Sequence, residues 1–215
     1  ISNMHTMSGG KKYQFKYKYE TSLLGEALGN DYDKLRGYND HNIGFGGPVP
    51  FLDNLTFWVS SQQTGNDSYR VYEFDDITFQ ENDVGNNINR ENIVAPWDTY
   101  AGMKGFGFNK TKDVFSKLAY KLGKSLRFSA SHWIVENHRK IFDENYLYWN
   151  DGQNELFKDT KRTTLEINHT LSNTTFYTLR ISNFNQGSFQ GVRWKDSDAD
   201  GYPDWFEWSY GAGQR

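Results

Sequence analysis

The chain has 215 residues, a formal net charge of -3 and no cysteine. Its Lys and Arg residues are spread along strands and loops, which excludes the electrostatic footprint of a nucleic-acid-binding protein. The lack of cysteine excludes a disulfide scaffold and a cysteine metal site. No apolar run reaches the roughly 18 residues of a transmembrane helix. Residues 1–10 lack the pattern of a signal peptide, so we expect any export signal to lie outside this sequence.

The composition combines low hydrophobicity with many aromatic residues. Hydrophobic residues make up 36% of the chain and the mean hydropathy is -0.83, yet aromatic residues reach 17%. Disordered chains are poor in aromatic residues, so this composition predicts a folded, β-rich protein that exposes many polar groups. Two classes fit: a membrane β-barrel with a wet interior and aromatic girdles, or a secreted β-sandwich with aromatic-lined sugar sites.

Three strands are expected before residue 63. Aromatic and polar residues alternate over residues 13–20, which predicts a strand with one aromatic and one charged face. After a polar stretch, alternation resumes over residues 39–47 until Pro48 stops it, and Leu55 begins a third strand. No period holds from Gln63 to Lys110, and a connection of this length usually has a function. Residues 63–110 are therefore expected to form a long surface loop.

Two hairpins are expected in the second half of the chain. Apolar residues alternate with polar ones over residues 114–122 and 126–134, and again over 163–171 and 175–181. For both apolar faces to point the same way, Leu122 must meet Leu126 and Leu171 must meet Thr175. Each hairpin then turns through three residues, and Gly123 supplies a permissive backbone in the first.

The expected connections alternate between long and short. They cover residues 21–38, 48–54, 63–110, 123–125, 137–161, 172–174 and 185–215. In an up-and-down meander every second connection lies at the same end, so all long loops fall on one rim, as in outer-membrane barrels. Strands of about 9 to 13 residues also match the length that crosses a bilayer at a tilt. The sequence thus predicts an all-β antiparallel meander: residues 1–215 form one partial transmembrane β-barrel of about seven strands, with long extracellular loops and short periplasmic turns.

Several of these segments resemble TonB-dependent outer-membrane receptors of Gram-negative bacteria. The residues that carry the likeness are the glycine-bearing start Ser8–Gly9–Gly10, the Gly46–Gly47–Pro48 strand end before the aromatic strand Leu55 to Val59, and the two later hairpins. In that family a plug precedes a barrel of about 22 strands. Seven strands without a plug would be a fragment, with open sheet edges at both ends.

The resemblance implies a transport function rather than an enzyme. Such a receptor binds a scarce nutrient at its extracellular loops, and the TonB complex drives import through the plug. The substrate would be a siderophore, cobalamin or a glycan, and residues 63–110 are the expected ligand-contacting loop. The alternative is a soluble, secreted, calcium-dependent carbohydrate-binding β-sandwich.

One motif has calcium-ligand spacing. Six residues stand at positions 1, 3, 5, 7, 9 and 12 of a calcium loop: Asp196, Asp198, Asp200, Tyr202, Asp204 and Glu207. Calcium takes six to eight oxygens, Gly201 permits the sharp turn, Tyr202 offers its carbonyl, and Glu207 would bind through both oxygens. We expect a structural Ca²⁺ site with a Kd of about 10⁻⁴ to 10⁻³ M; the alternative is an acidic turn without an ion.

Other candidates carry weaker patterns. His5, His41, His132, His138 and His169 show no ligand spacing, and no Ser or Cys setting supports hydrolysis. Glu166 and Arg180 are expected on the wet face. Three tryptophans lie near the acidic loop, and we expect them to pack in the protein rather than to stack on a sugar: Trp194, Trp205 and Trp208.

Overall fold

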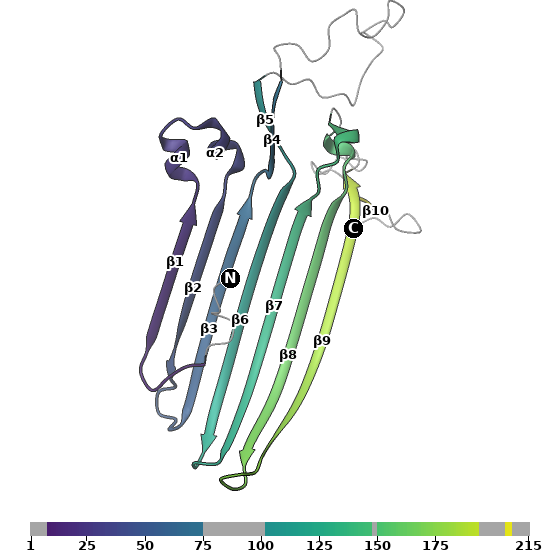
Figure 1. Cartoon of the computed structure of the whole chain (residues 1–215). Coiled ribbons are helices and arrows are strands. Elements are labelled where there is room, and N and C mark those ends of the chain that lie inside the picture. The colour runs from purple at the N-terminus through teal and green to yellow at the C-terminus, as the bar shows by residue number, and fades with distance from the viewer. Residues whose placement is uncertain (1–7, 75–101, 148–149, 194–204, 208–215) are drawn as a thin grey trace, which may run out of the picture.

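The computed structural model describes residues 8–74, 102–147, 150–193 and 205–207. Eight strands form one antiparallel sheet in the order β1-β2-β3-β6-β7-β8-β9-β10, and β4 and β5 form a separate two-stranded ribbon. Figure 1 shows the large sheet as a single layer of tall, tilted strands, with the ribbon extending from one end. The all-β antiparallel fold is therefore confirmed, and the sheet is open.

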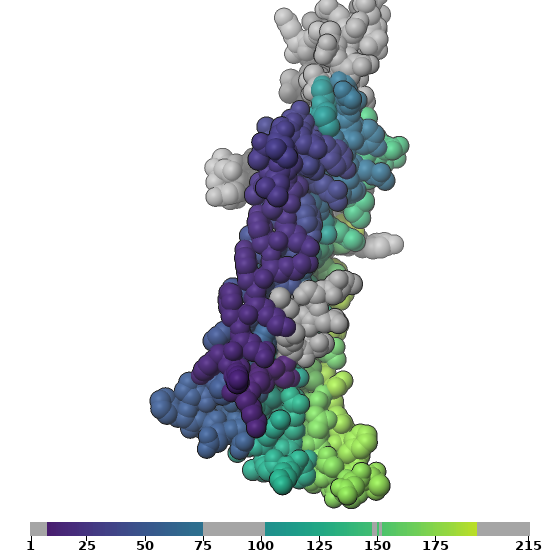
Figure 2. Space-filling view, turned by 60° about the vertical axis from the view of Figure 1, so that its left-hand side comes forward, coloured from purple at the N-terminus to yellow at the C-terminus, as the bar shows by residue number. Residues whose placement is uncertain are grey.

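Within the large sheet, the strands lengthen from 8 residues in β1 to 18 in β9. The strand bounds are β1 Gln14–Thr21, β2 Asn39–Pro48, β3 Leu55–Asn66, β4 Arg70–Phe74, β5 Gly102–Phe106, β6 Phe108–Leu122, β7 Leu126–Lys140, β8 Glu155–Thr170, β9 Phe176–Arg193 and β10 Trp205–Glu207. Figure 2 shows the molecule from the β1 side as a tall and narrow body. Each strand of the large sheet pairs with its neighbour in the meander, and β3 pairs with β6 across the connection that contains the β4–β5 ribbon.

The hairpin registers match the sequence prediction. Leu122 pairs with Leu126 across the turn at residues 123–125, and Gly123 has a φ of 65°, a left-handed conformation that favours glycine. In the later hairpin Leu165 pairs with Ile181, and the amide of Leu171 donates to the carbonyl of Thr175 over 2.8 Å. Both apolar faces therefore point the same way.

Several strands run past their predicted ends. The sequence predicts loops at residues 63–110 and 185–215, and this prediction is wrong for four segments. They are the last residues of β3, the first residues of β6, the β4–β5 ribbon and residues 185–193 of β9. The described residues contain ten strands, where about seven were expected. The alternation of apolar residues stops near Val114 and Ile134, but the backbone ladder continues because hydrogen bonding between strands does not need apolar side chains.

The β1–β2 connection contains two short helices that the sequence interpretation missed. They are α1 (Leu23–Ala27) and α2 (Asp31–Arg36). The side chain of Asn30 caps α2 by accepting from the amides of Tyr32 and Asp33, and Gly37 ends it in a left-handed conformation. Each helix is too short to leave a periodic signal.

The long connections gather at one end of the sheet. Those between β1 and β2, β3 and β6, and β7 and β8 lie at the upper end in Figure 1, whereas the turns after β2, β6 and β8 lie at the lower end. Two single-turn 3-10 helices, η3 (Glu144–Tyr146) and η4 (Asn150–Gly152), lie in the β7–β8 connection. The predicted separation of long loops from short turns is confirmed for these connections.

Candidate functional site

The large sheet has two chemically different faces. We call one the apolar face; its middle and lower part, the apolar band, contains Phe15, Tyr17, Tyr19, Ile43, Phe45, Leu55, Phe57, Val59, Val114, Leu118, Tyr120, Leu122, Leu126, Phe128, Ala130, Ile134, Leu165, Ile167, Tyr177, Leu179 and Ile181. Successive side chains alternate, so their neighbours form the polar face.

On β2 and in the middle of β3, burial on these faces is inverted relative to a soluble protein, and on β9 both faces are exposed. On the apolar face, Phe45 is 44% and Ile181 64% exposed, whereas on the polar face Asn42 is 1% and Ser60 2% exposed. Within the described ranges, no second sheet covers Leu165, Leu179 or Ile181. A soluble β-sandwich would bury these side chains against a second layer, because exposed contiguous apolar patches are rare on soluble monomers.

The apolar band is slanted relative to the rows of directly paired residues that cross the sheet. One row of directly paired residues runs through Tyr17, Ile43, Ser61, Val114, Ile134, Lys161 and Asn185. Tyr17 is central to the band on β1, but on β9 the centre is Leu179, six residues below Asn185. With a rise of about 3.3 Å per residue and about 4.8 Å between strands, the band slopes by roughly 35° from these rows.

The band has a packed surface of its own. The rings of Tyr13 and Phe45 stack at 6.0 Å between centroids, and Phe45 meets Phe57 edge to face at 5.4 Å. A shallow groove of about 290 Å³ lies between β6, β7 and β8 and is lined by Leu118, Phe128, Leu165 and other apolar residues.

The polar face carries a hydrogen-bonded lattice between neighbouring strands. Glu166 accepts from Arg180 Nε at 2.7 Å and from Asn168 at 2.7 Å, and Asn168 accepts from Thr178. Trp133 Nε1 donates to Asp113 over 2.8 Å. Glu166 and Arg180 thus lie on the face where the sequence placed them. The lattice holds side chains of adjacent strands together without an apolar core.

The segment before β1 lies against this polar face. Arg127 of β7 donates to the hydroxyl of Ser8 over 3.1 Å. A Cβ atom on Gly9 would come within 2.0 Å of the carbonyl oxygen of Phe57, whereas one on Gly10 would meet no other atom closer than 3.8 Å. Only glycine therefore fits at position 9, because the backbone of β3 cannot move aside cheaply.

This contact gives a matched pair of variants. Gly9→Ala should displace the segment and weaken its docking by about 1 to 3 kcal/mol, the usual cost of overpacking, while Gly10→Ala should not. Because the chain has no native cysteine, Ser8→Cys provides a single label site. A water-soluble maleimide should react faster with it in the Gly9→Ala background than in the Gly10→Ala background. Equal rates would contradict the docking.

Aromatic residues fix the β4–β5 ribbon to the long-loop end. Phe106 is fully buried, and its ring lies 4.9 Å from that of Phe142 and 5.9 Å from that of Tyr72. The Tyr72 hydroxyl donates to Glu144 over 3.1 Å. Desolvation, and then this hydrogen bond, raise the pKa of Tyr72 above its ordinary value.

A buried ionic group lies on the apolar face above the band. Glu155 is fully buried and contacts Nε2 of His138 at 2.6 Å and Nζ of Lys140 at 3.2 Å. Lys140 also donates to the carbonyl of Asn150 over 3.2 Å, which ties the β7–β8 connection to the sheet. The His138 ring stacks on Phe157 at 3.9 Å. The sequence interpretation missed this group because it assigned residues 137–161 to a loop.

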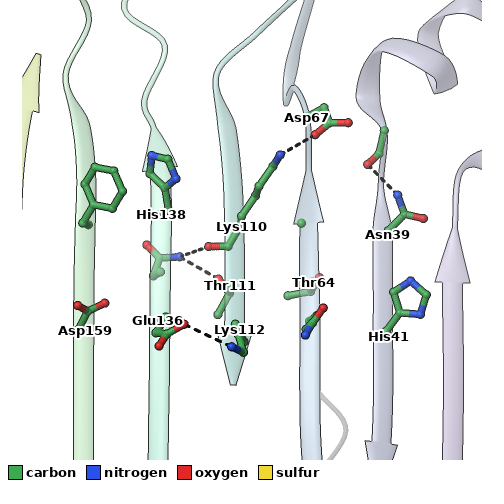
Figure 3. A pocket seen from close by; sticks show the side chains of 15 residues that line it. Asn39, His41, Thr64, Asp67, Lys110, Thr111, Lys112, Glu136, His138 and Asp159 are labelled. Carbon is green, nitrogen blue, oxygen red and sulfur yellow. Dashed lines mark hydrogen bonds and ion pairs between the residues drawn. The ribbon is translucent and has the colours of Figure 1, made fainter. Parts of the chain in front are cut away.

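A polar pocket of about 570 Å³ opens beside this group, in the rows just above the band. Figure 3 shows Lys110 directed toward Asp67 and Lys112 toward Glu136, with His41 and Asp159 on flanking strands. The two ion pairs measure 3.1 and 3.8 Å. The pocket therefore presents cations, carboxylates and amides from neighbouring strands.

The calcium motif is largely outside the part of the chain that the structure describes. Asp196, Asp198, Asp200, Tyr202 and Asp204 lie outside it, and Glu207 lies in β10, where its backbone pairs with Gly191. Among the described residues no group of three or more His, Cys, Asp or Glu could hold a metal ion. Trp194 and Trp208 also lie outside the described residues. The calcium site thus stays a prediction.

Comparisons with known proteins identify no relative. No protein-family model, curated protein or solved structure matches the chain. Within the described ranges, every helix is too short or too polar to span a membrane. The two faces of the sheet and the arrangement of its loops are therefore the features that bear on function.

Proposed function

We propose that this chain is part of the β-barrel of a TonB-dependent receptor in a bacterial outer membrane. The apolar band faces lipid, the polar face lines the lumen, and the long connections lie outside the cell. The receptor imports a scarce nutrient, and the TonB complex supplies the energy through a plug. The observation that carries the proposal is the uncovered apolar face of the sheet, together with the inverted burial on β2, where Phe45 is 44% exposed and Asn42 is buried.

The slope of the band supports a barrel in particular. Strands in a closed barrel tilt by about 35 to 45° from the axis, so a membrane-parallel band must cross the pairing rows at that angle. The slope of roughly 35° agrees with this range. On β6 the band runs from Val114 to Leu122, which at about 3.3 Å per residue is about 26 Å along the strand. On a strand tilted by about 35 to 45°, this length covers about 19 to 22 Å of height, a few Å less than the roughly 25 Å apolar band of outer-membrane barrels.

Two features favour a receptor over other outer-membrane barrels. The segment at Ser8 and Gly9 lies on the polar face, where a preceding plug would lie, and it resembles the plug-to-barrel junction of these receptors. The Gly46–Gly47–Pro48 strand end also resembles that family. The edge of β1 is unpaired among the described strands, and further strands would have to pair there, since an open edge invites aggregation.

In this proposal the nutrient binds at the long-loop end of the sheet. The nutrient, a siderophore, cobalamin or a glycan, would contact the connection between β3 and β6, whose described part includes the anchored β4–β5 ribbon. A Ca²⁺ ion bound at the acidic loop after β9 would stiffen this rim.

Single-cysteine labelling tests the two-faced arrangement. Two adjacent rows of paired residues on β8 and β9 provide four label sites at nearly the same height on the sheet. Leu165 and Ile181 lie on the apolar face, and Thr164 and Ser182 lie on the polar face. Each is changed to cysteine and labelled with a fluorophore in the intact protein, reconstituted in vesicles. Lipids with brominated acyl chains should quench the labels at 165 and 181, and iodide in water those at 164 and 182. Equal quenching of all four by iodide, in a protein that stays monomeric without detergent, would overturn the proposal.

A further inference from the structure

We infer that the polar pocket above the apolar band binds the phosphorylated sugar headgroup of an outer-leaflet glycolipid, an inference that rests on the proposed membrane location. The pocket continues the lipid-facing surface toward the long-loop end. On β6, β7 and β2 its side chains lie two residues above the last apolar residue of the band, in the pairs Lys112 and Val114, Glu136 and Ile134, and His41 and Ile43. All of these side chains are on the apolar face. A lipid whose acyl chains cover the band would therefore place its headgroup in this pocket.

The charges in the pocket suit phosphate groups. Lys110 and Lys112 have side chains that are 60% and 53% exposed, so their ion pairs with Asp67 and Glu136 are solvent-exposed. Exposed pairs contribute about 0 to 1 kcal/mol, so both ammonium groups can bind a phosphate at little cost. The Lys112 pair, at 3.8 Å, is also longer than a hydrogen bond.

The remaining lining suits sugar hydroxyls better than a simple phospholipid. Glu136 and Asp159 pair directly across β7 and β8, and Gln63 and Asn39 add amides from β3 and β2. Carboxylates and amides both bond hydroxyl groups, whereas the two carboxylates would repel a bare phosphodiester. The volume of about 570 Å³ also falls in the range of small-molecule sites and exceeds what a single phosphate needs.

One wall of the pocket is rigid and aromatic. Phe157 lines it together with His138, and the two rings stack at 3.9 Å. The buried Glu155 holds His138 from behind at 2.6 Å. Fixed rings offer the C–H faces of a sugar a preorganised surface, which lowers the entropy lost on binding.

Paired lysine variants of β6 test the inference. Lys110→Ala/Lys112→Ala removes two cations from the pocket, and Lys117→Ala/Lys121→Ala removes two from the polar face of the same strand. The intact proteins, purified in detergent, are titrated with micelles of rough lipopolysaccharide and with vesicles containing phosphatidylglycerol, and binding is followed by native mass spectrometry and calorimetry.

We expect the pocket variant to bind lipopolysaccharide at least about tenfold more weakly than the control variant, since two charge-assisted contacts are lost. The unmodified protein should prefer lipopolysaccharide over phosphatidylglycerol. Equal binding by the two variants, or equal binding of the two lipids, would overturn the inference. If the labels at residues 165 and 181 are nevertheless quenched by lipid, the barrel proposal survives and only the headgroup site fails.

Discussion

In the proposed barrel, Leu165→Arg should lower the free energy of unfolding by about 2 to 4 kcal/mol, the cost of a cationic side chain on the lipid face near the bilayer midplane. Leu165 lies in the middle of the apolar band on β8, is 54% exposed and pairs with Ile181. In a water-soluble protein, a substitution at so exposed a position would change stability by less than about 0.5 kcal/mol. The experiment is a urea titration of the intact protein in lipid vesicles, followed by tryptophan fluorescence.

Thr164→Arg is the matched control, because it puts the same side chain at the next residue of β8. Thr164 lies on the polar face and shares a 3.0 Å hydroxyl contact with Ser182. An arginine there would enter the water-filled lumen, so the expected loss is about 1 kcal/mol or less, the worth of one hydrogen bond. If Thr164→Arg is as damaging as Leu165→Arg, or more so, the assignment of the two faces is wrong.

Glu155→Ala should destabilise the protein by about 3 to 5 kcal/mol, because it leaves Lys140 buried without its carboxylate partner. Lys140 is 5% exposed, and Glu155 also binds His138 at 2.6 Å. The loss should appear in urea unfolding and as faster amide exchange in residues 141–147, since the group ties this connection to β7 and β8.

Lys112→Ala serves as the comparison for the buried group. It breaks the exposed 3.8 Å pair with Glu136 between the neighbouring strands, for which we expect a loss below about 1 kcal/mol. The double variant Glu155→Leu/Lys140→Met should recover most of the stability lost in Glu155→Ala, because well-packed apolar groups can replace a buried ion pair. A cost for Glu155→Ala no larger than that for Lys112→Ala would show that the group does not stabilise the fold.

The parts of the fold that follow from local chemistry were predictable. Strict alternation marks a strand wherever one face is apolar, and parity then fixes the register, as the pairs Leu122–Leu126 and Leu165–Ile181 confirm. Prediction failed where the apolar face becomes polar, beyond Lys112 and Glu136 and at Asp159. There the strands continue, but the period-two signal is lost.

The polar pocket and the Glu155 group could not be found from the sequence. Lys110, His138 and Phe157 are separated by long stretches of chain and become neighbours only because β6, β7 and β8 pair in one register. Ordinary charged residues in a segment without a period give no sign of such a cluster. The contact of Gly9 with the backbone of β3 is equally non-local.

By itself, the sequence determined the all-β class, the apolar and polar faces, the three-residue turns and the sorting of long loops to one end, because these depend on side-chain alternation and short-range connection. The tertiary structure decided how far each strand runs, which face is exposed and how the apolar band slopes across the sheet. Those features depend on backbone pairing summed over many strands, and no single segment encodes that sum.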